Sequence, residues 1–287
     1  MSADASIEAA QEPAQRQKRQ PRAFLFLLLA IGTVLSILYM PLLTDNQHFY
    51  MSDHSYYFQP FTHYIAERLR RGEIPLWNPY VYCGMSQIAV PSPGIFYPPN
   101  LIFLACKYGQ GLSFIMLFHQ LVAAAGAFLF IASFGWGIPA ALIGGLAASL
   151  CGYVCSMVTN HTLATTACWL PLLMWSFRAM VLAAEAEQRN KLLWLCALAS
   201  VTLAMYIGCG RPEVAVPGAA LVALFIVLHA RRAVKCNALK WQLLAIASGT
   251  LIAGPVILPT AEWISVSPRA HGLNLSQVLM WSTNWYD

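Results

Sequence analysis

Charged side chains are scarce in this sequence. Only 10% of its 287 residues are Asp, Glu, Lys or Arg, and 58% are hydrophobic, whereas a soluble domain carries about 25% charged residues. The mean hydropathy is +0.57. These values exclude an ordinary soluble domain and indicate a protein of the lipid bilayer.

Metal-binding and disulfide patterns are also missing. No C-x-x-C pair occurs among the eight cysteines. Cys151 and Cys155 share a helix face, but they lie in an apolar stretch without His or carboxylate neighbours, so we interpret them as small core residues. Only Cys83 falls clearly in a polar segment, which argues against a disulfide framework. The first hydrophobic run lacks a small-x-small cleavage pattern and predicts an uncleaved anchor.

Hydrophobic runs of membrane-spanning length are what the chain does contain. A crossing needs about 20 mainly apolar residues, and by this rule we place seven spans. They lie near 23–43, 112–134, 138–158, 163–183, 192–209, 213–230 and 241–261. The expected fold class is therefore an all-α polytopic membrane protein with about seven transmembrane helices and a long ordered first outer loop.

The remaining segments complete the predicted organisation. Residues 1–22 form a polar tail rich in Ala and Gln, for which we expect disorder in the cytoplasm. Residues 44–111 form the outer loop, and 112–261 a bundle of about six helices. Residues 262–287 form an outer segment that stops without a closing element, which predicts a fragment or a short form of a larger membrane protein.

The distribution of basic residues predicts the orientation. With the amino terminus in the cytoplasm, the inner side receives eleven of the 17 basic residues, as the positive-inside rule requires. These are Arg16, Lys18, Arg19, Arg22, Arg178, Arg189, Lys191, Arg231, Arg232, Lys235 and Lys240. We expect an integral protein of the bacterial inner membrane, in contact with membrane lipids. Its net charge of +5 needs no nucleic-acid partner.

The outer loop is the one long polar segment between hydrophobic runs, and it holds Asp45 and Asp53. Its apolar residues Phe58, Phe61, Ile65 and Leu69 recur at steps of three and four, which predicts a short amphipathic helix along the membrane surface. Six prolines between residues 73 and 100 exclude a long helix or a central strand there.

Carboxylates and cations at one membrane face suit sugar transfer from a lipid phosphate carrier. A carboxylate takes the proton of the acceptor hydroxyl, and cations stabilise the departing phosphate. Asp53 or Asp45 is the candidate base. The candidate phosphate contacts are Arg68, Arg70, Arg71 and Arg211.

Two further candidates have structural alternatives. His161 lies at the outer end of a span, either as an interfacial residue that contacts head groups or as a hydrogen-bond donor to a phosphate or sugar. Arg211 and Glu213 lie at a turn between two spans, where Gly208 and Gly210 end one helix and Pro212 can start the next. They form either an ion pair within the loop or a substrate contact.

Several runs resemble a known family: GEIPLWNPYVYCGMSQIAVPSPGIFYPPNLIF (72–103), FHQLVAAAGAFLF, NHTLATTACWLPLL, GRPEVAVPGAAL and ILPTAEWISVSPRA. They resemble the YfhO family of bacterial membrane proteins, within the GT-C superfamily of polytopic glycosyltransferases. The resemblance implies an inverting transferase that uses a polyprenyl-phosphate sugar as co-substrate and an envelope polymer, lipid or protein as acceptor.

The same resemblance implies specific residue roles. A GT-C enzyme carries a functional Asp in its first outer loop, and Asp53 is the best match, with Asp45 second. Members that use monophosphate donors resemble metal-independent enzymes, so we expect no metal and no other cofactor, although two outer carboxylates leave a divalent ion open. A transporter or flippase of a lipid-linked substrate and a non-catalytic membrane scaffold are the alternatives. The near absence of charge within the spans disfavours the first of these.

Overall fold

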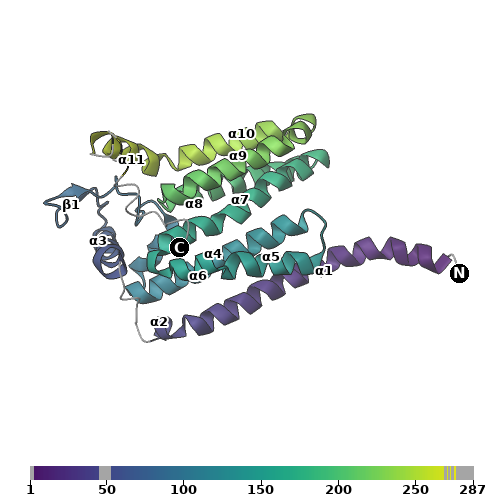
Figure 1. Ribbon diagram of the computed structural model, residues 1–287, viewed down its shortest axis with the longest axis horizontal. Helices are drawn as coiled ribbons and strands as arrows, with labels where there is room; N and C mark the ends of the chain where they lie inside the picture. Colours follow the sequence, from purple (N-terminus) through teal and green to yellow (C-terminus); the bar gives the residue numbers. More distant parts are fainter. Residues whose placement is uncertain (1–2, 45–52, 268–269, 271, 273–274, 276–287) are drawn as a thin grey trace.

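A computed structural model describes residues 3–44, 53–267, 270, 272 and 275. Long helices lie roughly side by side, with the outer-loop elements gathered at one end of the bundle (Figure 1). The helices of the bundle are α1 (Ala3–Leu38), α4 (Tyr108–Ala132), α5 (Ile138–Leu150), α6 (Gly152–Ser156), α7 (His161–Glu185), α8 (Arg189–Gly208), α9 (Pro212–Lys235), α10 (Ala238–Ile252) and α11 (Gly254–Val266).

The predicted spans correspond to these helices. In the described residues, six stretches are long and apolar enough to cross a membrane: Pro21–Leu38, Tyr108–Ala132, Ile138–Ser156, His161–Glu185, Arg189–Gly208 and Pro212–Lys235. The pair α10 and α11 makes a seventh if it is counted as one span bent by 65°. An all-α membrane protein is thus confirmed at this level, and α4 begins at Tyr108 rather than at the predicted 112.

The amino-terminal segment differs from expectation. Helix α1 begins at Ala3, within the residues for which the sequence predicts a disordered tail. Low hydrophobicity does not prevent helix formation, because Ala, Gln, Glu, Lys and Arg all have high helix propensity. The predicted span therefore continues backwards as one helix.

Helix α7 occupies the middle of the bundle and packs against α4 on one side and α8 on the other. The α4–α7 approach depends on Gly126, because a Cβ atom there would lie 2.4 Å from the backbone nitrogen of Leu172. Gly126 belongs to the run AAAGA (123–127), in which small side chains allow two helices to pack closely.

The outer loop folds into short elements at one end of the bundle (Figure 1). They are α2 (Met40–Thr44), the π-helical turn η1 (His54–Phe58), α3 (Gln59–Arg70), the antiparallel pair β1 (Trp77–Asn78) and β2 (Met85–Ser86), and the 3-10 turn η2 (Pro98–Leu104). In the strand pair, Trp77 lies opposite Ser86. Gly84 allows the turn to close, since a Cβ there would lie 2.6 Å from the Trp77 ring.

Helix α3 is the predicted amphipathic helix, but its apolar face does not lie on a membrane surface. Phe58, Phe61 and Ile65 are all buried within the protein, and α3 packs against η2 and α4. The hydrophobic period thus predicts the helix correctly, whereas its apolar face is covered by the chain itself.

Tyr97 fixes the loop to the bundle through a buried polar chain. The indole Nε1 of Trp169 donates to the Tyr97 hydroxyl over 2.8 Å, and that hydroxyl contacts Nε2 of His119. Nδ1 of His119 lies 2.6 Å from the carbonyl oxygen of Ile115, which fixes Nδ1 as the protonated nitrogen and Nε2 as the acceptor. A second attachment comes from α11, where the Thr260 hydroxyl donates to the Ala89 carbonyl over 3.4 Å.

Candidate functional site

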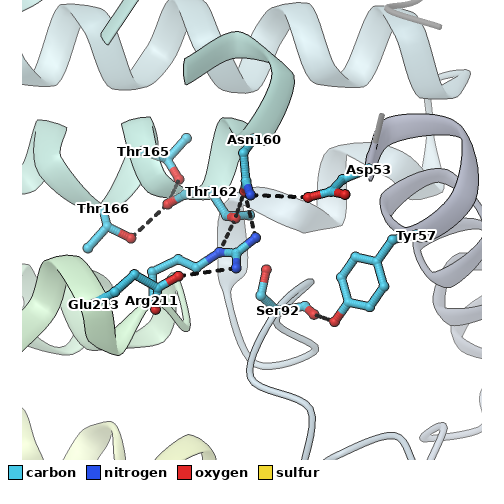
Figure 2. Close-up of polar contacts among 9 residues, drawn as sticks. All are labelled: Asp53, Tyr57, Ser92, Asn160, Thr162, Thr165, Thr166, Arg211 and Glu213. Atoms are coloured by element: carbon cyan, nitrogen blue, oxygen red, sulfur yellow. Dashed lines mark hydrogen bonds and ion pairs between the residues drawn. The ribbon is translucent and has the colours of Figure 1, made fainter. Parts of the chain in front are cut away.

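Three segments that are distant in the sequence meet at the end of the bundle where the outer loop lies. Asp53 directly precedes η1, Asn160 ends the short turn η3 (Met157–Asn160), Thr162 lies in the first turn of α7, and Arg211 caps α9. Figure 2 shows their side chains pointing toward one another. We call Asp53, Asn160, Thr162, Arg211 and Glu213 the polar cluster.

Arg211 is the centre of the polar cluster (Figure 2). Its Nε donates to the Thr162 hydroxyl and its Nη2 to the side-chain oxygen of Asn160, each over 2.6 Å. Its Nη1 reaches Oε1 of Glu213 over a longer 3.3 Å. The Nη1 side is therefore the least tightly held edge of the guanidinium.

Asn160 joins the cation to the carboxylate. Its Oδ1 accepts from Arg211, and its Nδ2 donates to Oδ2 of Asp53 over 3.3 Å. The guanidinium offers only donors and the ionised carboxylate only acceptors, so a single orientation of the Asn160 amide satisfies both. Asn160 thus holds Asp53 and Arg211 in a fixed relation.

The polar cluster is asymmetric in its exposure. The Arg211 side chain is only 18% exposed, whereas that of Glu213 is 52% exposed, and Asp53 is exposed as well. The Cζ atom of Arg211 lies 5.5 Å from the ring centroid of Phe58, which shields that side from water. A ligand can therefore reach the carboxylates directly and the guanidinium from one edge.

Tyr57 borders the polar cluster and ties η1 to the following loop. Its hydroxyl donates to the carbonyl of Ser92. Burial raises the pKa of Tyr57 to about 12, although the nearby Arg211 charge opposes this shift. The hydroxyl consequently remains a neutral donor at physiological pH.

The three arginines of α3 have different partners. Arg68 pairs with Glu73 over 2.8 Å, and Arg71 pairs with Glu67 one helical turn away. Arg70 instead donates to the carbonyls at the end of η2. None of the three joins the polar cluster, and the Glu67–Arg71 pair is what an i, i+4 spacing already indicates.

Of the remaining candidates, His161 is placed differently from expectation and Asp45 lies outside the described residues. His161 is 4% exposed. Its ring stacks on His54 with centroids 5.4 Å apart and meets Phe58 at 4.6 Å. This burial contradicts an interfacial contact with head groups, because η1 covers the histidine. The alternative role of His161 as a donor to a phosphate or sugar stays a prediction.

Sequence reasoning missed Asn160 and Thr162. Both belong to the NHT run between two spans, in which only the titratable His161 attracts attention. Neutral polar side chains have no charge to mark them, but Asn and Thr next to a helix start are typical capping residues. Their position opposite the GRPE turn in the bundle is a tertiary contact that no local pattern contains.

The polar cluster has no evident set of metal ligands. Within the described part of the chain, no three His, Cys, Asp or Glu side chains converge in a way that could hold a metal ion. Metal independence remains a prediction. Chemically, the polar cluster offers an exposed carboxylate to accept a proton and a guanidinium edge to contact an anion.

Comparison of the chain with protein-family models, with curated proteins and with solved structures finds no match.

Proposed function

We propose that this protein is a membrane transferase that moves a sugar from a lipid phosphate carrier to an acceptor hydroxyl at the outer membrane face. This proposal accords with the resemblance to the YfhO family and to GT-C enzymes. The observation that carries it is the Asn160 bridge, which holds an exposed carboxylate next to a guanidinium.

In the proposed reaction, Asp53 accepts the proton of the acceptor hydroxyl. The oxygen of that hydroxyl attacks the anomeric carbon and forms the new glycosidic bond, while the bond from that carbon to the phosphate oxygen breaks. Its electron pair leaves with the lipid phosphate, whose growing negative charge Arg211 stabilises. Attack opposite the leaving group inverts the anomeric centre.

A groove beside the polar cluster supports a lipid-linked donor. It has a volume of about 450 Å³, and α7, α8, α9 and α10 line it mainly with apolar side chains. On α9 it extends from Ala215 to Val227, which corresponds to about 18 Å of helix. Since Ala215 lies one helical turn from Arg211, a lipid chain in this groove would carry its phosphate toward the polar cluster.

Asp53→Asn tests the proposal. Purified full-length protein in liposomes would receive polyprenyl-phosphate sugars and bacterial envelope extract as acceptor, and released polyprenyl phosphate would be measured. Because an amide cannot take a proton, we expect the rate to fall by about 10²–10⁴-fold. Glu73→Gln removes a loop carboxylate that pairs with Arg68 away from the polar cluster and should leave the rate nearly unchanged.

Undiminished transfer by Asp53→Asn, or an equal loss in Glu73→Gln, would refute the assignment. Movement of the lipid-linked sugar across the bilayer without any transfer product would favour the flippase alternative.

A non-catalytic scaffold is the second candidate. The observation in its favour is that Arg211 already donates to Asn160, Thr162 and Glu213, which is enough to fix the loop without any ligand. Full biological function of a variant with alanine at Asp45, Asp53 and Arg211 together would support it.

A further inference from the structure

A separate cavity lies within the outer loop. It has a volume of about 440 Å³ and lies between α3 and the first turn of α4. His63 and Arg70 contribute from α3, Cys106 and Lys107 from the segment before α4, and Tyr108 from the start of α4. We call it the α3–α4 cavity, and it shares no residue with the polar cluster.

The pairing of charges in the outer loop leaves this cavity positive. Glu67 forms an ion pair with Arg71, and Glu73 forms one with Arg68. Neither Arg70 nor Lys107 has a carboxylate partner in the described part of the chain. No acidic residue lines the cavity, so two cationic side chains border a concave space without a counter-ion. Such a space attracts anions.

Arg70 is held in place for such a contact. Its Nε donates to the carbonyl of Leu104 over 3.1 Å and its Nη2 to that of Phe103 over 2.8 Å. These bonds fix the plane of the guanidinium and leave Nη1 without a hydrogen-bond partner in the described residues. A group positioned beforehand loses less conformational freedom when a ligand binds.

Lys107 and the backbone add to the same field. Lys107 is exposed and directly precedes α4, whose residues Tyr108 and Gly109 also line the cavity. The first N–H groups of a helix have no partner within it, and this end carries a partial positive charge. Helix and side chains therefore favour an anion at the same place.

From these features we propose that the α3–α4 cavity binds a phosphate-bearing group. Arg70 and Lys107 supply the charge, and Thr62 and Gln59 line the wall with further polar atoms. Since α4 is a candidate membrane span that begins at Tyr108, the site lies at the depth of lipid head groups. The proposal does not depend on sugar transfer, because it concerns binding alone.

Protection of Cys106 from alkylation is a direct test. Cys106 lines the cavity, whereas Cys83 is exposed and lies outside it, so Cys83 serves as an internal control. Full-length protein in maltoside detergent would react with N-ethylmaleimide, and mass spectrometry would follow each cysteine. The probes are inorganic phosphate, phosphatidylglycerol, and a digalactosyl lipid with the same acyl chains but no phosphate.

We expect a phosphate-bearing probe to slow alkylation of Cys106 while that of Cys83 stays constant. Protection by inorganic phosphate identifies a free phosphate as sufficient, and protection by phosphatidylglycerol alone identifies a lipid head group. Lys107→Gln should raise the half-protecting concentration at least about tenfold, because a hydrogen bond from a charged group contributes more than the free energy that corresponds to a tenfold change. Arg71→Gln neutralises a cation outside the cavity and should have little effect.

Three results would overturn the proposal: no protection by either phosphate probe, equal protection by the digalactosyl lipid, or unchanged protection in Lys107→Gln. Arg70→Gln also removes the contacts of Arg70 with η2, so Lys107→Gln is the variant that decides. The Lys107 side chain makes no ion pair in the described residues, so Lys107→Gln removes its charge without breaking a contact within the protein. Loss of transfer in Asp53→Asn with intact Cys106 protection would separate this site from the proposed catalytic one.

Discussion

The two ends of the bundle each hold a largely buried arginine, and the comparison shows how context separates a structural role from a candidate functional one. At one end, Arg178 donates to the hydroxyl and carbonyl of Ser133, and its Cζ lies 3.7 Å from the Phe134 ring centroid. All these partners belong to the single segment that ends α4. Arg178 thus caps a helix.

At the other end, Arg211 brings together segments from three parts of the chain. Asn160 links it to the exposed carboxylate of Asp53. A helix-capping role needs neither the exposure of Asp53 nor its link through Asn160. The lesson is that the number of segments that converge, and the accessibility of what they carry, distinguish the two sites better than burial does.

Neutralising each arginine is the strongest way to break this comparison. Arg211→Gln should lower transfer per folded molecule by about 10²–10³-fold, the usual effect of removing one preorganised contact to a developing charge. Arg178→Gln should leave that rate unchanged and cost about 1–3 kcal/mol of stability. Transfer assays on folded protein and thermal unfolding in detergent give the two quantities. Equal losses of rate would show that the two arginines do not differ in role.

Tyr97→Phe tests whether the buried hydrogen bonds between Trp169, Tyr97 and His119 stabilise the outer end of the bundle. Removing the hydroxyl leaves the Trp169 donor and the His119 acceptor unpaired in an interior site, which should cost about 2 kcal/mol. Thermal unfolding monitored by tryptophan fluorescence would measure it. Tyr80→Phe is the matched control, because Tyr80 lies in the same loop and is 83% exposed. Similar shifts in both variants would contradict the proposed anchoring role.

A smaller effect is expected from pH at the border of the polar cluster. The pKa of Tyr57 is about 12 in the folded protein, above the ordinary value of about 10. The neutral form is thus favoured by folding, so its stabilising contribution is complete below pH 10 and disappears as the pH rises toward 12. The unfolding temperature should fall more steeply over this window in the wild type than in Tyr57→Phe, with Tyr56→Phe as the exposed control. Parallel slopes in all three would argue against burial of this hydroxyl.

Much of the bundle follows from the sequence, because each span must be apolar along its whole length. The bend between α10 and α11 is missing from the predicted span 241–261, although Gly254 and Pro255 directly after Ala253 are residues at which helices commonly kink. Asp53 and Arg211 stand out by their charge in a chain with only 10% charged residues. Their connection through Asn160 cannot be seen in the sequence, because it depends on which turns lie side by side at the end of the bundle.

The outer loop shows the same limit. Periodicity indicates α3 correctly but does not say whether its apolar face meets lipid or protein, since both are apolar. The distribution of its charges is partly readable: Glu67 and Arg71 are one turn apart, whereas the contacts of Arg70 with η2 arise only when the loop folds.

The bend at Ala253 has a consequence for how the membrane acts on the loop. Helix α10 has 15 residues and reaches about 22 Å, less than the hydrocarbon thickness of about 30 Å. If α10 and α11 form one bent span, the first turns of α11 complete the crossing, and Thr260 with its bond to Ala89 lies close to the lipid boundary. A thicker or thinner bilayer changes the tilt that such a segment adopts, so lipid composition can shift this edge of the loop mechanically.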